Sequence, residues 1–378
     1  MQKRIRIVSV GIILIVLLIS IIVLNNNTNN KQTFKKDGIL YALSLDGKSI
    51  TSFPSKGLYK ANVTCEGADG KWLYDDWKLA IENITGDVSC DIKFETITKT
   101  YLNNYIIGLT GTTQGTGQVV NEKGYRYEGK NPNNYAWFNN EYWRIIGVFD
   151  SGSHGQSGKN LVKIIRADVL DGLAWHKSNT NDWTAASLNS LLNGAYYNAQ
   201  DETSSGYCYG YSTTATANCD YTKKGIQSGY RSMIAEVTWY LGGYSSASAT
   251  TESFYGYERG TTVYSGRPTT TTGYIGLMYP SDYGYSVLSS SCARTTNLGS
   301  YNTATCAGQS WLYGKGYEWT ITPNSSSSYI VFGLYGSGTL GNNYANHGLG
   351  GRPVLYLDAS VYKIDGEGTL DKPYIIGM

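Results

Sequence analysis

The first hydrophobic feature of the chain is an unbroken apolar run over residues 7–24, which contains no charged side chain. A helix of this length spans roughly 27 Å, close to the hydrocarbon thickness of a bilayer. A cleaved signal peptide would need small residues around its cleavage site, and the run instead leads from Leu24 directly to Asn25. The pattern favours an uncleaved signal anchor with a polar spacer, together residues 1–36, and leaves cleavage as the alternative.

Short alternating runs over residues 37–98 predict a small β module. The run "GILYALSLDG" ends in Asp46-Gly47, a turn signal, and "GLYKANVTC", "WKLAIENI" and "GDVSCDIKF" follow it. Because a module of this size buries little core, a bridge between Cys65 and Cys90 would help to hold it. The next residues, 99–124, contain "TGTTQGTGQ" and are predicted to be a linker.

Residues 125–378 are predicted to form one large domain that opens with strands. The segment "YAWFNNEYWRIIGVFD" has the pattern of a hairpin that turns at Asn139-Asn140, and "LVKIIR" is a second strand. Further on, "YIGLM", "YIVFGLY" and "RPVLYL" are the strongest strand candidates.

Two helices are predicted in this domain. The first is capped by Asn181 or Asp182, and the second covers about 224–241 and ends at Gly242-Gly243. Each has an apolar face at helical spacing, made of Leu188, Leu191, Leu192 and Ala195 in the first and of Met233, Ile234, Val237 and Tyr240 in the second. Two early helices followed by a long, irregular antiparallel β region predict an α+β fold.

The charge distribution excludes one class of partner. Formal net charge is +2, but six of the 31 basic residues precede Asp37, which leaves 25 basic against 29 acidic residues and a net of −4. No basic face remains for nucleic acid. The chain also has 34 Tyr against 7 Phe, a composition typical of exposed β-rich surface proteins.

The cysteine pattern predicts disulfides. All six cysteines follow the apolar run, and no C-x-x-C motif or His at metal spacing accompanies them. An even count in an exported chain is typical of disulfides, although six cysteines allow 15 connectivities and reduced thiols are the alternative. Pairing of sequence neighbours is the hypothesis that we adopt: Cys65–Cys90, Cys208–Cys219 and Cys292–Cys306.

No motif predicts a catalytic residue, a cofactor or a metal site. Gly336, Gly338 and Gly341 match G-x-G-x-x-G, but the glycines and Pro353 that follow prevent the helix that a dinucleotide site requires, so we interpret them as turn residues. The three histidines, His154, His176 and His347, are far apart, and G-x-S-x-G does not occur. We therefore expect a protein that is not an enzyme.

Two resemblances refine this picture. The arrangement of Trp72, Trp77, Leu79, Cys90 and Phe94 resembles small β domains that recur in uncharacterised surface proteins of Gram-positive-type bacteria. The segments "YEGKNPNNYAWFNNEYWRIIGVF", "SGRP…YIGLMYPSDYGY", "WTITPNSSS" and "GGRPVLYLDASVYKIDGEGTLDKPYII" resemble a large family of uncharacterised bacterial surface domains. That family is similar to the C-type-lectin-like fold, in the broad group that includes formylglycine-generating enzymes and variable display proteins.

The departures from that group matter for function. C-type lectins bind Ca²⁺ through an E-P-N-like loop followed by W-N-D, whereas Pro323-Asn324 lacks the Glu and "NDW" at 181–183 lies upstream. The reactive cysteine pair of formylglycine-generating enzymes has no matching context at Cys292 and Cys306. Neither activity is therefore carried over to this chain.

The candidate ligand-binding residues lie in a polar segment between two strong strands, where a rigid scaffold would hold a mobile loop. Tyr344 is its aromatic anchor, and the segment's candidates are Asn342, Asn343, Tyr344, Asn346 and His347. We predict a single-pass cell-membrane protein, its C-terminal bulk extracellular, that binds glycan or a surface protein at a bacterial surface. The alternative is a structural envelope or pilus-like component that self-associates.

Overall fold

The computed structural model describes residues 23–24, 33–36, 38–74, 76–202, 208–215, 219–314 and 316–378. The chain divides into two compact units, Met1–Lys99 and Thr100–Met378. Most of the expected signal anchor, residues 7–22, lies outside the described residues, and the end of the apolar run, Val23–Leu24, forms strand β1. No helix within the described ranges combines the length and the apolar character needed to cross a membrane.

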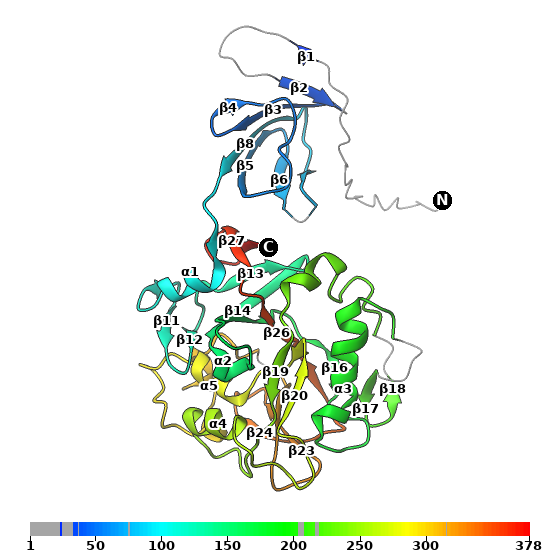
Figure 1. The fold of residues 1–378 in the computed structure, drawn as a ribbon, viewed down its shortest axis with the longest axis vertical. Coiled ribbons are helices and arrows are strands. Elements are labelled where there is room, and N and C mark those ends of the chain that lie inside the picture. Colours follow the sequence, from blue (N-terminus) through cyan, green and yellow to red (C-terminus); the bar gives the residue numbers. More distant parts are fainter. Residues whose placement is uncertain are drawn as a thin grey trace, which may run out of the picture. The chain divides into compact units, whose positions relative to one another are not determined.

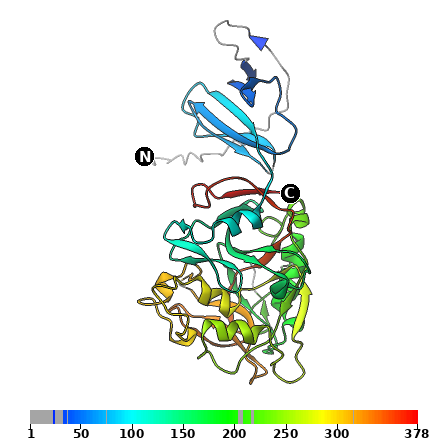
Figure 2. The ribbon, with the colours of Figure 1, turned by 60° about the vertical axis from the view of Figure 1, so that its left-hand side comes forward.

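The first unit is a β module built on one mixed sheet (Figures 1 and 2). Its strand order is β1 (Val23–Leu24), β2 (Thr33–Lys36), β3 (Ile39–Leu45), β8 (Ser89–Thr96) and β5 (Tyr59–Glu66), with β4 (Lys48–Ser49) paired to β3. A separate hairpin joins β6 (Asp69–Leu73) and β7 (Lys78–Glu82). Because β2 pairs along β3, the end of the expected spacer belongs to this sheet.

Local sequence signals explain this module. Asp46 and Gly47 both adopt positive φ, 49° and 78°, so they close the β3–β4 hairpin as the Asp-Gly pair predicts. Cys65 lies directly opposite Cys90 across β5 and β8, with 4.1 Å between their Cα atoms, and the two form the predicted disulfide. Ile92 and its neighbours pack around Trp72 and Phe94 on the inner face.

The second unit contains a large curled sheet. Its main path is β10 (Thr113–Gln114), β11 (Gly117–Asn121), β12 (Tyr125–Gly129), β14 (Glu141–Phe149), β13 (Tyr135–Phe138), β28 (Tyr374–Gly377), β27 (Tyr362–Asp365) and β9 (Thr100–Tyr101). On the other side of β14, the sheet continues through β15 (Leu161–Arg166), β26 (Val354–Leu357) and β21 (Ile275–Gly276).

A second sheet and two strand pairs complete the strands of this unit. The sheet order is β16 (Leu170–Ala174), β25 (Gly348–Gly351), β22 (Glu318–Pro323), β23 (Ile330–Leu334) and β24 (Leu340–Tyr344). One pair is the hairpin of β17 (Tyr209–Tyr211) and β18 (Thr214–Ala215), and the other joins β19 (Val237–Tyr240) antiparallel to β20 (Thr270–Gly273) across a longer connection.

The helices of the second unit are short. They are α1 (Leu102–Gly108), α2 (Ser151–His154), α3 (Ser187–Leu191), α4 (Thr251–Glu258) and α5 (Pro280–Ser286). A π-helical turn, η2 (Leu192–Tyr196), extends α3, and 3₁₀ turns form η1 (Trp183–Ala185), η3 (Ser228–Met233), η4 (Leu298–Ser300) and η5 (Ala307–Gln309). Together with the sheets they make the predicted α+β class.

The expected linker over 99–124 is part of the second unit. Residues from Thr100 onward belong to that unit, where β9 pairs with β27 and β11 pairs with β12. Leu102, Ile106 and Val119 are fully buried in its core. The segment "TGTTQGTGQ" therefore forms β10, the start of β11 and the turns beside them, which composition alone does not distinguish from a linker.

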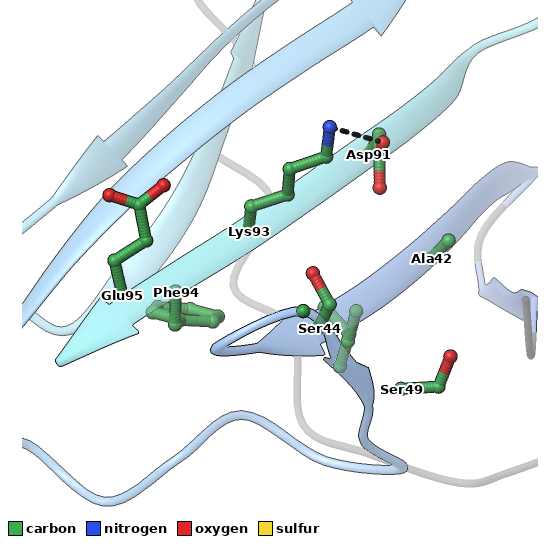
Figure 3. Close-up of a pocket in the computed structure, with 9 residues that line it drawn as sticks. Ala42, Ser44, Ser49, Asp91, Lys93, Phe94 and Glu95 are labelled. Atoms are coloured by element: carbon green, nitrogen blue, oxygen red, sulfur yellow. Dashed lines mark ion pairs between the residues drawn. The ribbon is translucent and has the colours of Figure 1, made fainter.

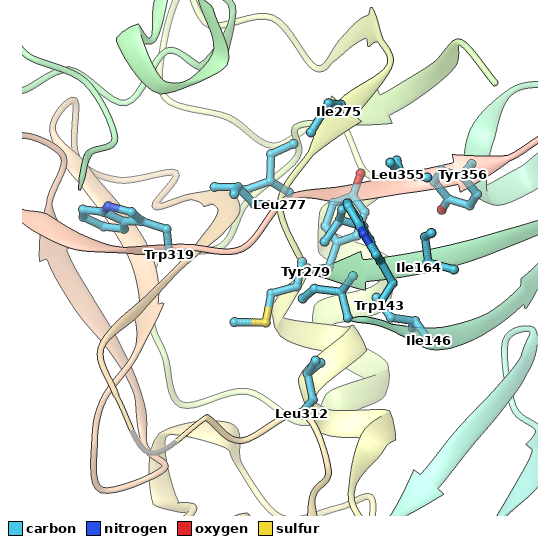
Figure 4. Close-up of a cluster of buried hydrophobic side chains, with 14 of the residues drawn as sticks. Trp143, Ile146, Ile164, Ile275, Leu277, Tyr279, Leu312, Trp319, Leu355 and Tyr356 are labelled. Carbon is cyan, nitrogen blue, oxygen red and sulfur yellow. The ribbon is translucent and has the colours of Figure 1, made fainter. Parts of the chain in front are cut away.

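The predicted hairpin is confirmed. β13 and β14 pair in register on either side of Asn139 and Asn140, whose φ values of 57° and 58° are those of a two-residue turn that matches the twist of the strands. Next to β14 lies β15, and next to β15 lies β26. Side chains from these three strands, among them Trp143, Ile164 and Tyr356, belong to the buried cluster in Figure 4.

The first predicted helix forms, but it begins later than expected. Its apolar residues Leu188, Leu191, Leu192 and Ala195 are all buried, as predicted. However, the side chain of Asp182 accepts from the backbone N–H of Thr184 and so caps the 3₁₀ turn η1, while α3 starts at Ser187 after the extended residue Ala186.

The second predicted helix, 224–241, is wrong. The 3₁₀ turn η3 covers Ser228–Met233, and β19 then runs over Val237–Tyr240. Within β19 buried and half-buried positions alternate, since Val237 and Trp239 face the core. The β-branched and aromatic residues of this run favour a strand, and pairing with β20 supplies its hydrogen bonds.

The two remaining disulfides are Cys208–Cys219 and Cys292–Cys306, and no described cysteine is free. The pairing of sequence neighbours is therefore confirmed for all three bridges.

Candidate functional site

The polar segment that contains the predicted site residues is more ordered than the mobile loop we expected. Asn342, Asn343 and Tyr344 lie on β24, which pairs with β23 along its length. Asn346 and His347 form the turn that leads into β25, where the N–H of His347 donates to the carbonyl of Tyr344. Backbone pairing with β23 thus converts a Gly- and Asn-rich stretch into a strand.

Four aromatic rings form a continuous row at this place. Tyr329 and Tyr344 stack with centroids 5.5 Å apart and planes 16° apart. Tyr344 is 5.1 Å from the ring of His347, which in turn stacks on Tyr211 at 5.5 Å and 26°. We call these four residues the aromatic row. Its tyrosines are exposed, at 41% for Tyr329, 45% for Tyr344 and 56% for Tyr211.

Tyr211 reaches the row from a distant part of the sequence. It lies on β17, and the N–H of Ser212 at the hairpin turn donates to the carbonyl of Asn346 at 2.6 Å. The disulfide Cys208–Cys219 closes the loop that carries this hairpin. Any side chain in place of Gly348 would collide with the carbonyl of Gly210, so the glycine permits the close approach of the hairpin to β25.

Backbone hydrogen bonds hold the other end of the row. The N–H of Ala345 donates to the carbonyl of Tyr329 at 2.9 Å, and the N–H of His176 donates to the carbonyl of Ala345 at 2.8 Å. The side-chain amide of Asn181 is buried and donates to the carbonyls of Asn324, Ser327 and Ile330. The segment that presents Tyr329 is therefore tied to the scaffold on both sides.

Polar groups surround the row. The Asn342 side chain is exposed, and in the part of the chain that the structure describes the amide nitrogen of Asn343 is buried without a hydrogen-bond partner. Lys177, half-buried, donates from Nζ to the hydroxyl of Tyr209 at 3.1 Å. Exposed rings beside amide, hydroxyl and ammonium groups can contact an apolar face of a ligand and hydrogen-bond its polar edge.

The sequence reasoning located Tyr344 and His347 but missed Tyr211 and Tyr329. Tyr329 is the first residue of the strand candidate "YIVFGLY", and Tyr211 belongs to a Tyr/Gly run next to Cys208. A tyrosine next to a disulfide in a polar hairpin was a usable signal for Tyr211. The contact itself joins residues far apart in the chain, which no local pattern reveals.

A second group of charged side chains lies in the interior of the unit, and the sequence analysis missed it. Asp282 at the start of α5 accepts from Arg126 Nη1 at 2.9 Å and from Lys163 Nζ at 2.5 Å, and all three side chains are about 1% exposed. Nearby, Glu258 pairs with Arg259 at 3.1 Å and accepts from both the N–H and the hydroxyl of Ser281. We call these five charged residues the buried ion cluster.

Burial and mutual charge shift the pKa values in this cluster. Burial alone would raise the pKa of Asp282, but the charges of Lys163 and Arg126 bring it down to about 2. Burial lowers the pKa of Lys163 to about 8 against the attraction of Asp282. Burial also raises the pKa of Glu258 to about 7 despite the neighbouring Arg259. All five groups are paired and four of them are buried, with Arg259 12% exposed, so we interpret the cluster as structural.

The first unit has a pocket of its own, of about 320 Å³, on the β3 and β8 side of its sheet (Figure 3). Its charged lining consists of Asp91, Lys93 and Glu95, and Lys93 pairs with Asp91 at 3.5 Å. Both pair members are partly solvent-exposed, and the Glu95 carboxylate accepts from Asn62. The charged lining residues of this pocket therefore already have partners within the module.

The remaining sequence candidates do not assemble into a site. Gly338 adopts φ of 90° in the turn between Tyr335 and Thr339, and strand β24 follows it. His154 and His176 are buried, and burial lowers the pKa of each. Across the described ranges, no group of three or more His, Cys, Asp or Glu side chains could hold a metal ion.

Comparison with known proteins adds no relative to this picture. No protein-family model matches the chain, and neither a curated protein nor a solved structure matches it.

Proposed function

We propose that this chain is an extracellular binding protein of a bacterial surface, held at the cell membrane by residues 7–24, and that the aromatic row is its ligand platform. The large unit is a binding domain of C-type-lectin-like type in this proposal, as its sequence resemblance implies. The observation that carries the proposal is the row itself, in which three exposed tyrosines and His347 are in ring contact.

The rings of the aromatic row have little conformational freedom left to lose when a ligand binds. A tyrosine in ring contact with its neighbours has already lost side-chain freedom, so a ligand that stacks on it pays little further entropy. Aromatic rings that cluster on a solvent-exposed surface are typical of interaction sites. The backbone pairing of β23 with β24 keeps the rings in place before the ligand arrives.

The ligand class that fits best is a saccharide. A pyranose ring has an apolar face of C–H groups that suits a tyrosine ring, and hydroxyls at its edge that suit amides. Asn342 and Asn346 supply such amides on either side of Tyr344. A protein ligand could also contact exposed rings and amides, but it does not require this combination. Self-association is the competing function.

The experiment is saccharide binding by the full-length chain on a glycan array, compared with Tyr344→Ala and with the control Tyr142→Ala. Tyr142 is 37% exposed and contacts two aromatic rings on the other sheet, so it matches Tyr344 in residue type and setting. We expect retention of saccharides by the native chain and the control, and loss in Tyr344→Ala. Concentration-dependent assembly without saccharide binding would favour the structural alternative.

A further inference from the structure

Resting on the proposed function, we infer that the aromatic row selects an acidic saccharide, and that Lys177 pairs with the carboxylate, sulfate or phosphate of that ligand. The inference concerns the charge of the ligand, which the stacking rings alone do not determine.

The first observation is the charge content of the segments that build the row. Four segments meet there, and backbone hydrogen bonds join them: 176–180, 209–214, 325–329 and 342–347. Their sequences are "HKSNT", "YGYSTT", "SSSSY" and "NNYANH". Histidine aside, the one charged residue among them is Lys177, and none of them contains a carboxylate. Arg267 also donates to Thr180 and Ser328 of these segments, but its charge is paired with Asp182 at 3.8 Å, so Lys177 supplies the net charge here.

The second observation is the setting of Lys177. Its Nζ donates to the hydroxyl of Tyr209 at 3.1 Å and lies 5.0 Å from the centroid of that ring. The backbone N–H of Lys177 donates to the hydroxyl of Ser187 at 3.1 Å, which holds the base of the side chain. Of the carboxylates that the structure describes, none forms an ion pair with Lys177.

These contacts leave the ammonium group ready for an anion. An ammonium has three N–H donors, and the neutral hydroxyl of Tyr209 takes one of them. Tyr209 orients the group without neutralising it. Arg166, which is also partly buried, differs in that its guanidinium pairs with the Glu141 carboxylate at 2.7 Å.

The third observation connects Lys177 to the row. Tyr209 and Tyr211 are alternate residues of β17, and Tyr211 stacks on His347. The strand that positions the partner of Lys177 therefore also positions the end of the aromatic row. A saccharide stacked on Tyr211 would therefore lie two residues along this strand from the partner of Lys177.

The test uses the full-length chain and an array that holds uronate-containing oligosaccharides next to their carboxyl-reduced counterparts. We expect the native chain to bind the acidic forms about tenfold more tightly, in line with a charge-assisted hydrogen bond at a half-buried site. Lys177→Met should remove that preference, and Lys177→Arg should retain it. Raising the salt concentration should weaken the binding of acidic saccharides by the native chain and leave the binding by Lys177→Met nearly unchanged.

Lys130→Met is the matched control, because Lys130 is an exposed lysine between β12 and β13 on the other sheet and its loss changes the net charge equally. Equal binding of acidic and reduced forms, with loss in Tyr344→Ala, would overturn the inference and leave the proposed function standing. A preference for acidic forms that persists in Lys177→Met would also overturn it. Failure to bind any saccharide would overturn the proposed function and this inference with it.

Discussion

The aromatic row with the neighbouring Lys177, and the buried ion cluster with the tyrosines packed against it, bring together similar side chains in opposite settings. Both combine tyrosine rings with positive charge, since Arg126 lies 4.6 Å from the ring of Tyr285 and Lys163 lies 4.4 Å from that of Tyr279. In the cluster every one of these groups is buried, and its charges are paired with Asp282 or Glu258. In the row the tyrosine rings are exposed, and beside the row Lys177 donates to a hydroxyl instead of a carboxylate.

The difference teaches how burial separates structure from function in a tyrosine-rich protein. A buried charge that loses its partner cannot recover the lost interaction from water, so removing one member is costly. Removing an exposed ring changes the unfolding free energy little, because that ring contributes little to the stability of the folded state. The cluster should therefore control stability and the row should control binding.

The largest expected effect is on stability, from Asp282→Ala. The variant leaves Lys163 and Arg126 buried without a carboxylate, and we expect the second unit to lose about 3–5 kcal/mol of unfolding free energy. Urea unfolding followed by tryptophan fluorescence measures it. Glu367→Ala removes the exposed pair with Lys372 and should stay within about 0.5 kcal/mol. A loss below about 1 kcal/mol for Asp282→Ala would show that the buried ion cluster does not stabilise the fold.

The next effect is a pH dependence that belongs to Glu258. Its pKa in the folded protein, about 7, lies above its ordinary value of 4.5, so the folded state holds the proton more tightly. That contribution is complete below pH 4.5 and is lost as the pH rises through 7, by up to about 3 kcal/mol.

Glu258→Gln keeps the shape of the side chain and cannot titrate, so the native-minus-variant difference in unfolding free energy should fall between pH 5 and 7.5. The lowered pKa values of His154 and His176 act in the opposite direction, but they are present in both proteins and cancel in the difference. Parallel profiles for the two proteins would show that Glu258 stays ionised in the folded state.

On the row, Tyr344→Ala should weaken ligand binding by about 2 kcal/mol, roughly thirtyfold, because an anchoring ring is lost. The unfolding temperature should stay nearly the same, since the side chain is 45% exposed. Affinity and thermal unfolding are measured on one preparation, with Tyr142→Ala beside it. A large fall in unfolding temperature would show that Tyr344 stabilises the fold as the buried tyrosines do, and would contradict the contrast between row and cluster.

The smallest effect is expected from Tyr344→Phe, which keeps the ring and removes the hydroxyl. If stacking carries the contact, affinity should change by no more than about threefold, within the net value of one hydrogen bond. Titration calorimetry resolves this difference. A loss of affinity as large as that of Tyr344→Ala would show that the ligand is held by a hydrogen bond to the hydroxyl and not by stacking on the ring.

Local signals in the sequence determined much of this protein. Asp46-Gly47 and Asn139-Asn140 predicted their hairpins because residues that tolerate positive φ are needed there and few types suit it. The three disulfides followed from the pairing of sequence neighbours. The strand "LVKIIR" and the apolar face of the helix around Leu188 were predicted correctly, since short apolar runs and helical periodicity both indicate burial.

Only the tertiary structure decided the rest, because the deciding contacts join distant residues. The run over 224–241 fits both helical and strand spacing, and its partner β20 determined that Val237–Tyr240 is a strand. Leu102 and Ile106 belong to the core because the chain returns to them from β27, near its end. The aromatic row joins residues 211, 329, 344 and 347 through hydrogen bonds and stacking across three segments. Asp282 meets Lys163 and Arg126 across 119 and 156 positions, a separation over which composition and spacing carry no information about contact.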